Sequence, residues 1–582
     1  MTSANNYQDN HMSDLRLQMM DITSLKAVLS ELRKKVIPSR LEKVQQSDTH
    51  SIQIAFRTLK GLTWIELSWH AESPRIVEIE APPRKIGEST LSKQIQCGGR
   101  GLALIQLKQD GFDRTVEFGF AIRPKGSFEK FLVLELMGRH SNLLFLDKKK
   151  KVITIGKQIR ATQSRLRPIS TGDLYFPPPP LQGLEPKRSY SFKEWKTQLT
   201  LLPITVKEAF QETYQGISPN LLLQLASNDK YSAEKLINLK INDLTDKNWE
   251  DLFSSWNKWL KDLEEENFCI SFHGPSPYRV WSQETLCASS NEKIGISLGK
   301  YYKNHLEAKA LKQIFKTLSK ALCKKKEAEE KNLIEQVKLY SQTNQIKSLY
   351  TKADEILCLS KPSKEKVKEA QKLYSQAKKF KRSKLILKER INHHKEMLRF
   401  INETDLFLDY IIKNKNESQS EKIESIKSLK EDIEGFILSK QQIVKRKYKS
   451  NNASTNLLQL KSPSGLTIQI GKNHRQNELI SLKNANKGDV WFHAQESPGS
   501  HVVIKAVNGT IKEPDLKICA DLAAFFSKAK QNNKVSVLMV PTSKLNKPKG
   551  AAPGMVTHRE GKVLWAEPSN GEKYLEQFTK NA

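Results

Sequence analysis

The segment from Asp489 to Lys505, DVWFHAQESPGSHVVIK, carries residue types that could do chemistry. It places two histidines, a tryptophan and a Pro-Gly-Ser turn between short apolar runs. Metal binding is the first possibility, because His493 and His501 flank the turn and could face each other. Zinc needs three or four convergent ligands, and no nearby cysteine supplies a third. The pattern therefore disfavours a metal site.

Nucleophilic catalysis is the second possibility, because Ser500 stands beside His501. Neighbours on a strand point to opposite faces, so such a pair rarely forms a catalytic dyad. The sequence has no GxSxG elbow, no Walker A loop and no GxGxxG loop. We therefore expect no catalytic residue and no cofactor.

RNA binding is the third possibility. Trp491 and His493 would share one strand face and offer planar groups for base stacking, and the turn would expose backbone N–H groups to a phosphate. Lysines near this segment add positive charge. The alternative is that Trp491 is a core residue and the turn is only a turn, and the residues alone leave it open. The candidate RNA-contacting residues are Lys472, Trp491, His493, Pro498, Gly499, Ser500, His501 and Lys505, with Lys547 and Lys549 nearby.

Composition favours a polyanionic partner. The chain has 582 residues, a net charge of +32 and a pI near 9.6. Such a field attracts nucleic acid without giving specificity, and a lysine-rich, AT-rich coding bias is the alternative source of the charge. The 6 cysteines show no CxxC pair or zinc spacing, so we expect free thiols. No apolar run suits a membrane span and the start lacks a signal-peptide layout, so a cytoplasmic protein without a membrane partner is expected.

The elements that position these residues divide the chain into five parts. Residues 1–19 are a patternless tail. Residues 20–180 combine a helix, DITSLKAVLSELRKKV, with alternating strand-like segments, and predict a mixed α/β domain with antiparallel strands that a polyproline linker ends. Residues 181–300 begin with a helix-turn-helix in which Gly216 closes one helix and Pro219 starts the next. Residues 451–582 are again α/β.

Residues 301–450 predict a pair of long antiparallel arms. Leu311, Phe315, Leu318 and Leu322 have the spacing of a coiled-coil seam, and Pro362 breaks the helix. A dense basic cluster lies on the second arm. It is either a solvated face or an RNA contact. Its members are Lys378, Lys379, Lys381, Arg382 and Lys384.

Several motifs resemble those of the NFACT family, in the same order and over nearly the whole chain after the tail. GFDRTVEF and LELMGRHSNLLFLD resemble its N-terminal domain. DVWFHAQESPGSHVVIK, with GKNHRQNEL before it and KPKGAAPGMV after it, resembles its C-terminal RNA-binding module, and adds Asn473 to the RNA-binding set. The resemblance implies a multidomain α+β fold: an N-domain similar to that of formamidopyrimidine glycosylases, a helix-hairpin-helix domain, antiparallel coiled-coil arms and an RNA-binding module.

The resemblance also implies a role in ribosome-associated quality control. Bacterial members bind large ribosomal subunits obstructed by peptidyl-tRNA and recruit charged tRNA, typically tRNA-Ala, so that the nascent chain receives a C-terminal tail that marks it for degradation. The ribosome supplies the chemistry, so the chain itself is expected not to be an enzyme. The implied tRNA-binding residues are Asp113, Arg114, Glu135, Leu136, Met137, Arg139 and His140, and the arms are expected to contact the ribosome.

Two alternative functions stay open at this stage. A fibronectin-binding surface adhesin is one, against which the missing signal-peptide layout speaks. A nucleic-acid repair enzyme is the other, but glycosylases of the similar fold need an N-terminal proline, and Thr2 or Asp21 stands where it would be. The quality-control role is therefore the expected one.

Overall fold

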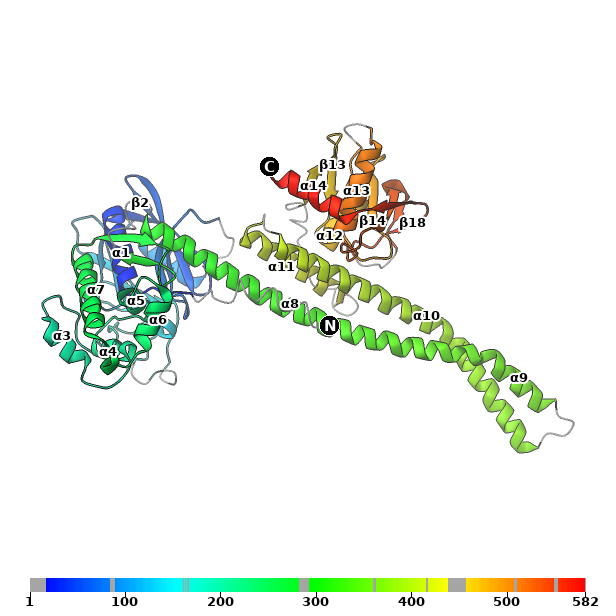
Figure 1. The fold of residues 1–582 in the computed structure, drawn as a ribbon, viewed down its shortest axis with the longest axis horizontal. Coiled ribbons are helices and arrows are strands. Elements are labelled where there is room, and N and C mark those ends of the chain that lie inside the picture. The colour runs from blue at the N-terminus through cyan, green and yellow to red at the C-terminus, as the bar shows by residue number, and fades with distance from the viewer. Residues whose placement is uncertain are drawn as a thin grey trace. The chain divides into compact units, whose positions relative to one another are not determined.

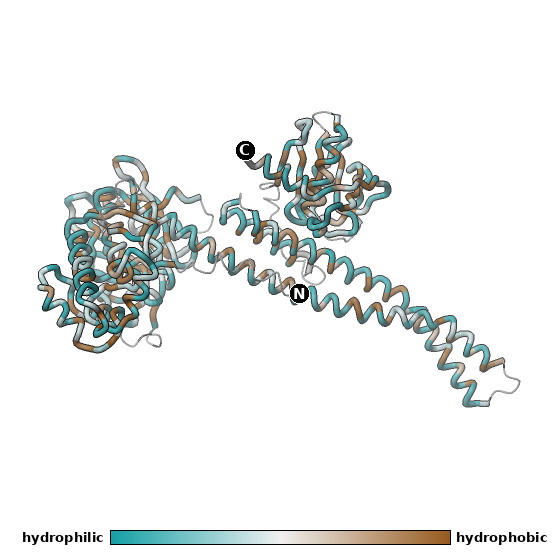
Figure 2. The backbone as a smooth tube through the Cα atoms, viewed as in Figure 1, coloured by the Kyte–Doolittle hydropathy of each residue, from teal (hydrophilic) through white to brown (hydrophobic). Residues whose placement is uncertain are grey.

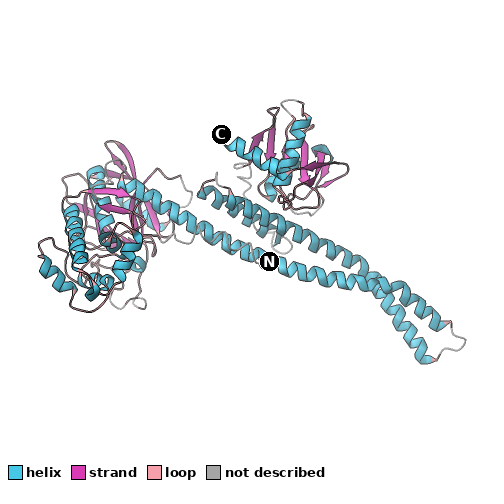
Figure 3. Ribbon diagram, in the orientation of Figure 1, coloured by secondary structure: helices cyan, strands magenta, loops and turns pink. Residues whose placement is uncertain are grey.

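The computed structural model describes residues 17–83, 89–160, 162, 164, 167–281, 293–358, 363–414, 417–437, 457–506, 510–548 and 553–580 (Figure 1). The chain divides into two units, Met1–Leu306 and Glu307–Ala582. Strands gather at the start of the first unit and at the end of the second, with long helices between them in the sequence (Figure 3). The predicted tail before Leu17, the proline break at Pro362 and Lys549 lie outside the described residues.

Helix α1, Ile22–Val36, organises the core of the first unit. Asp21 caps it, accepting a hydrogen bond from the Ser24 N–H at 2.9 Å, as the sequence predicts. Its apolar residues Leu25, Leu29 and Leu32 are fully buried. The helix is therefore a central element rather than a surface one.

A nine-stranded sheet, antiparallel throughout, packs against α1. Its order is β4-β3-β2-β1-β5-β6-β7-β8-β9, and helix α2, Thr90–Gly99, lies against β1. Alternating apolar residues form these strands because one face is buried. The strands are β1 Ser39–Asp48, β2 Ser51–Thr58, β3 Gly61–Ser68, β4 Arg75–Ile79, β5 Ala103–Lys108, β6 Thr115–Ala121, β7 Phe128–Glu135, β8 Asn142–Asp147 and β9 Val152–Ile155. The predicted antiparallel α/β domain is confirmed.

A helical segment follows and shares the same core. Trp195, Trp256 and Trp259 are completely buried and lie in one apolar cluster with α1. The predicted helix-turn-helix is confirmed: Gly216 has φ +76 and Pro219 is the first residue of α5. The elements are α3 Phe192–Leu199, α4 Val206–Thr213, α5 Pro219–Ala226, α6 Lys230–Asn238, η2 Ile241–Asp243, α7 Asp246–Glu264, β10 Phe268–Ser271 and β11 Arg279–Trp281.

The expectation of free thiols is wrong at one position. Cys269, in β10, is disulfide-bonded. Cys519 is buried and free, and burial raises its thiol pKa well above the ordinary value, as predicted for a neutral thiol. Cysteine spacing alone did not signal the bond, because the two halves of a disulfide need only be close in space.

Two long helices form the arms. Leu311, Leu318 and Leu322 of the predicted seam are buried against Met397 and Phe400. Apolar positions recur along both helices between long hydrophilic stretches (Figure 2). A short break that the sequence did not predict, η3 Thr343–Gln345, separates the first helix from α9. The helices are α8 Ile294–Gln342, α9 Ile346–Leu357, α10 Lys364–Lys413 and α11 Gln419–Ile437.

The C-terminal module is a six-stranded antiparallel sheet in the order β12-β13-β15-β14-β16-β19, with α13 and α14 packed on one face. A second, smaller apolar cluster covers the other face around Ile480 and Leu545. The elements are β12 Leu458–Lys461, β13 Thr467–Ile470, α12 His474–Glu478, η4 Leu479–Lys483, β14 Val490–Ala494, β15 Val502–Ile504, α13 Glu513–Phe525, β16 Val535–Pro541, η5 Thr542–Lys544, β17 Leu545–Asn546, β18 Thr557–His558, β19 Lys562–Ala566 and α14 Pro568–Lys580.

Candidate nucleic-acid interface

Asp113 and Arg114 lie in the connection from β5 to β6, as predicted. Both side chains are half-buried. The Arg114 N–H donates to Asp113 Oδ1 at 2.6 Å, so the carboxylate fixes the backbone of its neighbour. Within the described residues, the Arg114 guanidinium makes no hydrogen bond or ion pair. The loop therefore presents the Arg114 guanidinium, which can bind an anionic ligand.

The second predicted motif meets this loop at one end of the sheet. Thr115 pairs with Glu135, the last residue of β7, and the Leu136 N–H donates to the Arg114 carbonyl at 3.0 Å. Leu136 is fully buried, whereas Met137 is half-buried. Two stretches that the sequence singled out separately thus form one edge.

Glu135 is a buried support of this edge. It is only 1% exposed and accepts two hydrogen bonds from Arg167, at 2.9 and 2.6 Å. The Tyr175 hydroxyl donates to it at 3.1 Å, and burial together with this carboxylate raises the tyrosine's pKa. Arg167 also donates to the Phe176 carbonyl. Glu135 therefore holds the start of the polyproline linker and is not open to a ligand, while Arg167 and Tyr175 were not identified from the sequence.

Arg139 and His140 are the exposed part of the second motif. They lie in the short helix η1, Gly138–His140, whose glycine has φ +57. The Arg139 Nε donates to His140 Nε2 at 3.0 Å. With Arg114, these side chains give the edge three candidate contacts to phosphate or to a base.

Phe112 anchors the Asp113–Arg114 loop to the helical segment. Its buried ring lies 6.1 Å from that of Trp259, and Lys26 Nζ lies 4.8 Å from its centroid. A Cβ on Gly216 would approach Phe112 to 3.1 Å. The turn between α4 and α5 therefore fixes the position of the loop.

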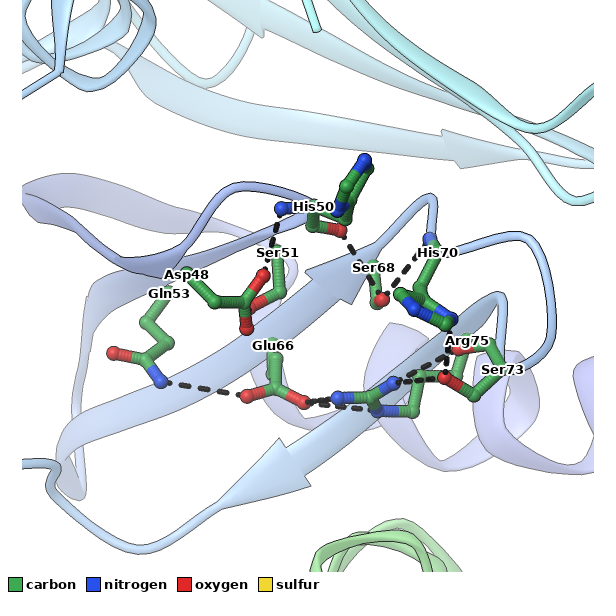
Figure 4. A network of polar contacts seen from close by, with 9 residues as sticks. All are labelled: Asp48, His50, Ser51, Gln53, Glu66, Ser68, His70, Ser73 and Arg75. Carbon is green, nitrogen blue, oxygen red and sulfur yellow. Dashed lines mark hydrogen bonds and ion pairs between the residues drawn. The ribbon is translucent and has the colours of Figure 1, made fainter. Parts of the chain in front are cut away.

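A polar network lies at the turns β1–β2 and β3–β4 (Figure 4). The rings of His50 and His70 are 5.5 Å apart, edge to face, and burial lowers the pKa of His70. Arg75 Nε donates to Glu66 at 2.9 Å. A Cβ on Gly138 of η1 would lie 3.7 Å from the Ala71 carbonyl oxygen, in the turn between β3 and β4. Nothing in the sequence signalled the network, since the two histidines belong to different turns.

In the C-terminal module, Trp491 and His493 share one strand face, as predicted. Their rings stack at 5.6 Å and 5°, and His501 meets both edge-on, at 5.1 and 5.4 Å. Of the two alternatives that the sequence left open, the structure favours a core position for Trp491, because Trp491 is 3% and His493 6% exposed. Burial lowers the pKa of His493 to about 3, so its ring is neutral. RNA contact by these rings stays a prediction that requires their cover to move.

The Pro498-Gly499-Ser500 turn packs against the end of α13. The Ser500 N–H donates to the Phe526 carbonyl at 3.0 Å, and the Pro498 carbonyl accepts from Lys528 N–H at 2.9 Å. A Cβ on Gly499 would lie 3.1 Å from the Phe526 carbonyl oxygen. The expectation that this turn offers the Ser500 N–H to a phosphate is therefore wrong in this conformation.

The remaining predicted residues of the module are paired. Lys472 forms an ion pair with Glu417, and Lys505 forms one with Asp489 at 2.8 Å. Asn473 caps α12 by accepting from the Gln476 N–H at 2.8 Å. No group of three or more metal-ligating side chains forms in the part of the chain that the structure describes.

The basic cluster on α10 is open. All five of its residues are exposed, and within the described residues none pairs with a carboxylate. Three of them line a groove with Tyr350 and Tyr374, whose rings are 5.8 Å apart. Lysines, arginines and aromatic rings together suit an RNA backbone with an unpaired base. Sequence reasoning missed the tyrosines, which come from two helices. The groove residues from the cluster are Lys378, Lys379 and Arg382.

Comparison with protein families assigns both halves of the chain. The sequence model of the NFACT N-terminal and middle domains matches residues 21–361, and that of the NFACT protein RNA binding domain matches residues 457–560. The chain belongs to the NFACT family. The edge formed by the two N-terminal motifs lies in the first match, and the buried aromatic set lies in the second. The basic cluster of the arms lies outside both NFACT ranges.

Relatives align over almost the full length. A Streptococcus pneumoniae protein named Rqc2 homolog RqcH is 26% identical over 581 residues, with 93% of this chain and 97% of that protein covered. A Bacillus subtilis protein of the same name is 26% identical, with 92% and 96% covered.

Solved structures match the chain only in part. The C-terminal part of a fibronectin/fibrinogen-binding protein from Streptococcus suis is 28% identical, covers 46% of this chain and 98% of its own, and has a TM-score of 0.37. Its N-terminal part gives 20% identity, 49% and 99% coverage and a TM-score of 0.36. These scores are too low to bear on function. None of the described helices combines the length and apolar character that crossing a membrane requires.

Proposed function

We propose that this protein is a ribosome-associated quality-control factor. It binds large ribosomal subunits obstructed by peptidyl-tRNA and recruits charged tRNA, specifically tRNA-Ala, for mRNA-independent tailing of the nascent chain in the cytoplasm. The name Rqc2 homolog RqcH, shared by relatives that align over 93% of the chain, supports this role. Membership of the NFACT family and the net charge of +32 agree with an RNA partner.

One observation carries the tRNA-binding part of the proposal. The Asp113–Arg114 loop and the segment Glu135–His140 meet through a backbone hydrogen bond of 3.0 Å, and the edge leaves Arg114 and Arg139 available. A guanidinium suits bidentate contact with phosphate or a guanine edge. We assign Arg114 and Arg139 to tRNA contact, and Glu135 to holding the edge in place.

The proposal needs binding surfaces and no active site of the protein's own. The ribosome supplies peptidyl transfer, so the protein has to place tRNA and hold the subunit. The open basic cluster beside Tyr350 and Tyr374 suits contact with ribosomal RNA. The arms are therefore the proposed anchor on the subunit.

The test is the double variant Asp113→Ala with Arg114→Ala. Loss of a bidentate contact costs on the order of 1–3 kcal/mol, so the affinity for tRNA, and with it the copurifying tRNA, should fall by about fivefold to somewhat more than a hundredfold. RNA sequencing of the purified protein measures this loss. Sedimentation with large subunits should persist, since the arms are unchanged.

The matched control is Glu42→Ala with Arg57→Ala. It also removes one carboxylate and one guanidinium, from an exposed ion pair at 2.6 Å on β1 and β2. The control should keep its tRNA. Wild-type tRNA content in the Asp113→Ala, Arg114→Ala variant would contradict the proposal, and a melting temperature many degrees lower would show that the pair serves the fold.

A further inference from the structure

Acidic side chains of the arms form ion pairs with Lys472 and Arg475, which make up the basic face of the C-terminal module. Lys472 pairs with Glu417, and both side chains are only 12% exposed. Arg475 Nε lies 2.6 Å from Asp432 Oδ1 in α11. The cations on and beside α12 are thus occupied from within the same unit.

The ring of His474 adds apolar packing to this contact. It is 1% exposed, and its ring stacks on that of Phe400 at 4.0 Å and meets that of Phe407 edge-on at 5.2 Å. Thr404 Oγ1 and His474 Nε2 are 2.9 Å apart. Burial lowers the pKa of His474 to about 3, so the ring enters the contact uncharged. Helix α12 therefore packs on the segment of α10 from Phe400 to Phe407, which we call the base of α10. Its neighbouring cations pair with Glu417 and with Asp432 of α11.

Helix α12 also contacts the aromatic set that was predicted to bind RNA. Asn477, in α12, accepts a hydrogen bond from the His501 N–H at 3.1 Å. The ring of His501 in turn meets those of Trp491 and His493 edge-on. The helix that docks on α10 is therefore also the one that holds the aromatic set.

Buried polar atoms without partners among the described residues remain both in the arm and in the module. Glu417 Oε2 and Gln419 Oε1 are unpaired on the arm side, and Trp491 Nε1 and His493 Nε2 are unpaired in the module. A buried polar group without a partner costs about 1–3 kcal/mol. These unpaired groups lower the stability of the docked state. The docked state can therefore exchange with an undocked state in which the same atoms find hydrogen-bond partners.

We propose that the base of the arms competes with RNA for the basic face of the C-terminal module. Glu417 and Asp432 hold the cations that RNA phosphates would take, and carboxylate and phosphate are equivalent acceptors for lysine and arginine. RNA then binds only to molecules in which α12 has left the arm. The apparent affinity of the whole chain is therefore the affinity of the undocked state reduced in proportion to the undocked fraction. This inference rests on the proposed RNA-binding role of the module.

The test uses the full-length chain and a fluorescein-labelled oligouridylate. The variant Glu417→Gln with Asp432→Asn weakens the docked state without changing side-chain size. Its Kd for the oligonucleotide should fall about tenfold, because more of the chain is undocked. Glu417→Gln alone, outside α11, should lower the Kd about threefold and covers the case in which the helix substitution harms folding.

The matched control is Glu424→Gln with Glu434→Gln. Both residues are exposed on α11, and Glu434 pairs only with Lys430 of its own helix, at 3.8 Å, among the described residues. When binding is measured above the pKa of Asp432, which burial raises to about 7, the control removes the same two charges, so a purely electrostatic effect would tighten binding equally in both. Competition predicts that the control stays within about twofold of the wild type.

Hydrogen exchange gives a second readout. Adding the oligonucleotide should speed amide exchange in the segment Phe400–Ile411, because docking against α12 is lost. Slower exchange there, or equal Kd values for wild type, variant and control, would overturn competition while leaving RNA binding intact. No measurable binding by any of the chains would overturn the RNA-binding role itself, and the inference with it.

Discussion

Glu135→Ala should act through folding, although Glu135 belongs to a motif that the family resemblance links to tRNA. The carboxylate is 1% exposed and holds Arg167 by two hydrogen bonds, while the Arg167 side chain is itself largely buried. Removing it leaves a guanidinium with no charge partner in a site of low dielectric. Breaking a buried pair in this way costs about 3–5 kcal/mol.

The corresponding loss of thermal stability is large. At about 2–4 °C per kcal/mol for a unit of this size class, the melting temperature should fall by about 6–20 °C. The polyproline linker should loosen as well, because Arg167 also donates to the Phe176 carbonyl at 3.0 Å. By contrast, Asp113→Ala with Arg114→Ala changes half-buried residues and should shift the melting temperature by no more than a few degrees.

A double-mutant cycle distinguishes a role of Glu135 in supporting the fold from direct contact between Glu135 and tRNA. Differential scanning calorimetry on Glu135→Ala, Arg167→Ala and the double variant should give a coupling energy of about 1–3 kcal/mol. The Glu42→Ala, Arg57→Ala variant is the exposed comparison and should melt close to the wild type, because a solvated ion pair contributes little to stability. A Glu135→Ala protein that melts like the wild type and yet has lost its tRNA would refute this reasoning, because the carboxylate would then touch tRNA directly.

Three further outcomes are expected. Replacing Lys378, Lys379 and Arg382 by alanine should weaken cosedimentation with large subunits and lower its dependence on salt, since phosphate contacts release counterions; an unchanged salt slope in gradient fractions would exclude the arms as the anchor. Gly216→Ala, at φ +76, should cost about 1–3 kcal/mol and reduce copurifying tRNA, because the new methyl group pushes the anchored loop; a variant with wild-type stability and tRNA content contradicts this. His474 is neutral when folded but titrates near its ordinary pKa of about 6.5 when unfolded, so its stabilisation is present above that pH and is lost as the pH falls toward about 3. Thermal unfolding at stepped pH should show a steeper acid loss for the wild type than for His474→Gln, and equal slopes would show that the ring is not buried in solution.

Local sequence patterns predicted the strands and helices, but they did not predict which residues pack over each face of a strand. Alternation put Trp491 and His493 on one face, and the two rings are nearly parallel in the structure. Trp491 is buried in an apolar cluster with Ile480 and Leu545, which belong to other elements of the module. A period of two residues reports a shared face and carries no information about the layer above it.

Charge counting has a similar limit. Lys472 and Lys505 look equivalent in sequence to the lysines of the arms, but Lys472 forms an ion pair with the distant Glu417 and Lys505 forms one with Asp489 of the same segment. The Asp113–Arg114 loop was placed correctly, because strand-like segments on both sides define a connection. Its anchor, Phe112 against the helical segment, is a long-range contact that no local pattern encodes.

The paired and unpaired cations imply an order of events in RNA binding. Steering of a polyanion depends on charge that is free at encounter, and ion pairs within the protein cancel much of theirs. The basic cluster on α10 keeps its charge available, whereas Lys472 and Arg475 are held by carboxylates. Encounter through the arms therefore needs no rearrangement and should be fast and sensitive to salt. Binding by the module should follow more slowly, at a rate set by the release of α12, and a stopped-flow trace with one fast and one concentration-independent slow phase is the kinetic pattern that this order requires.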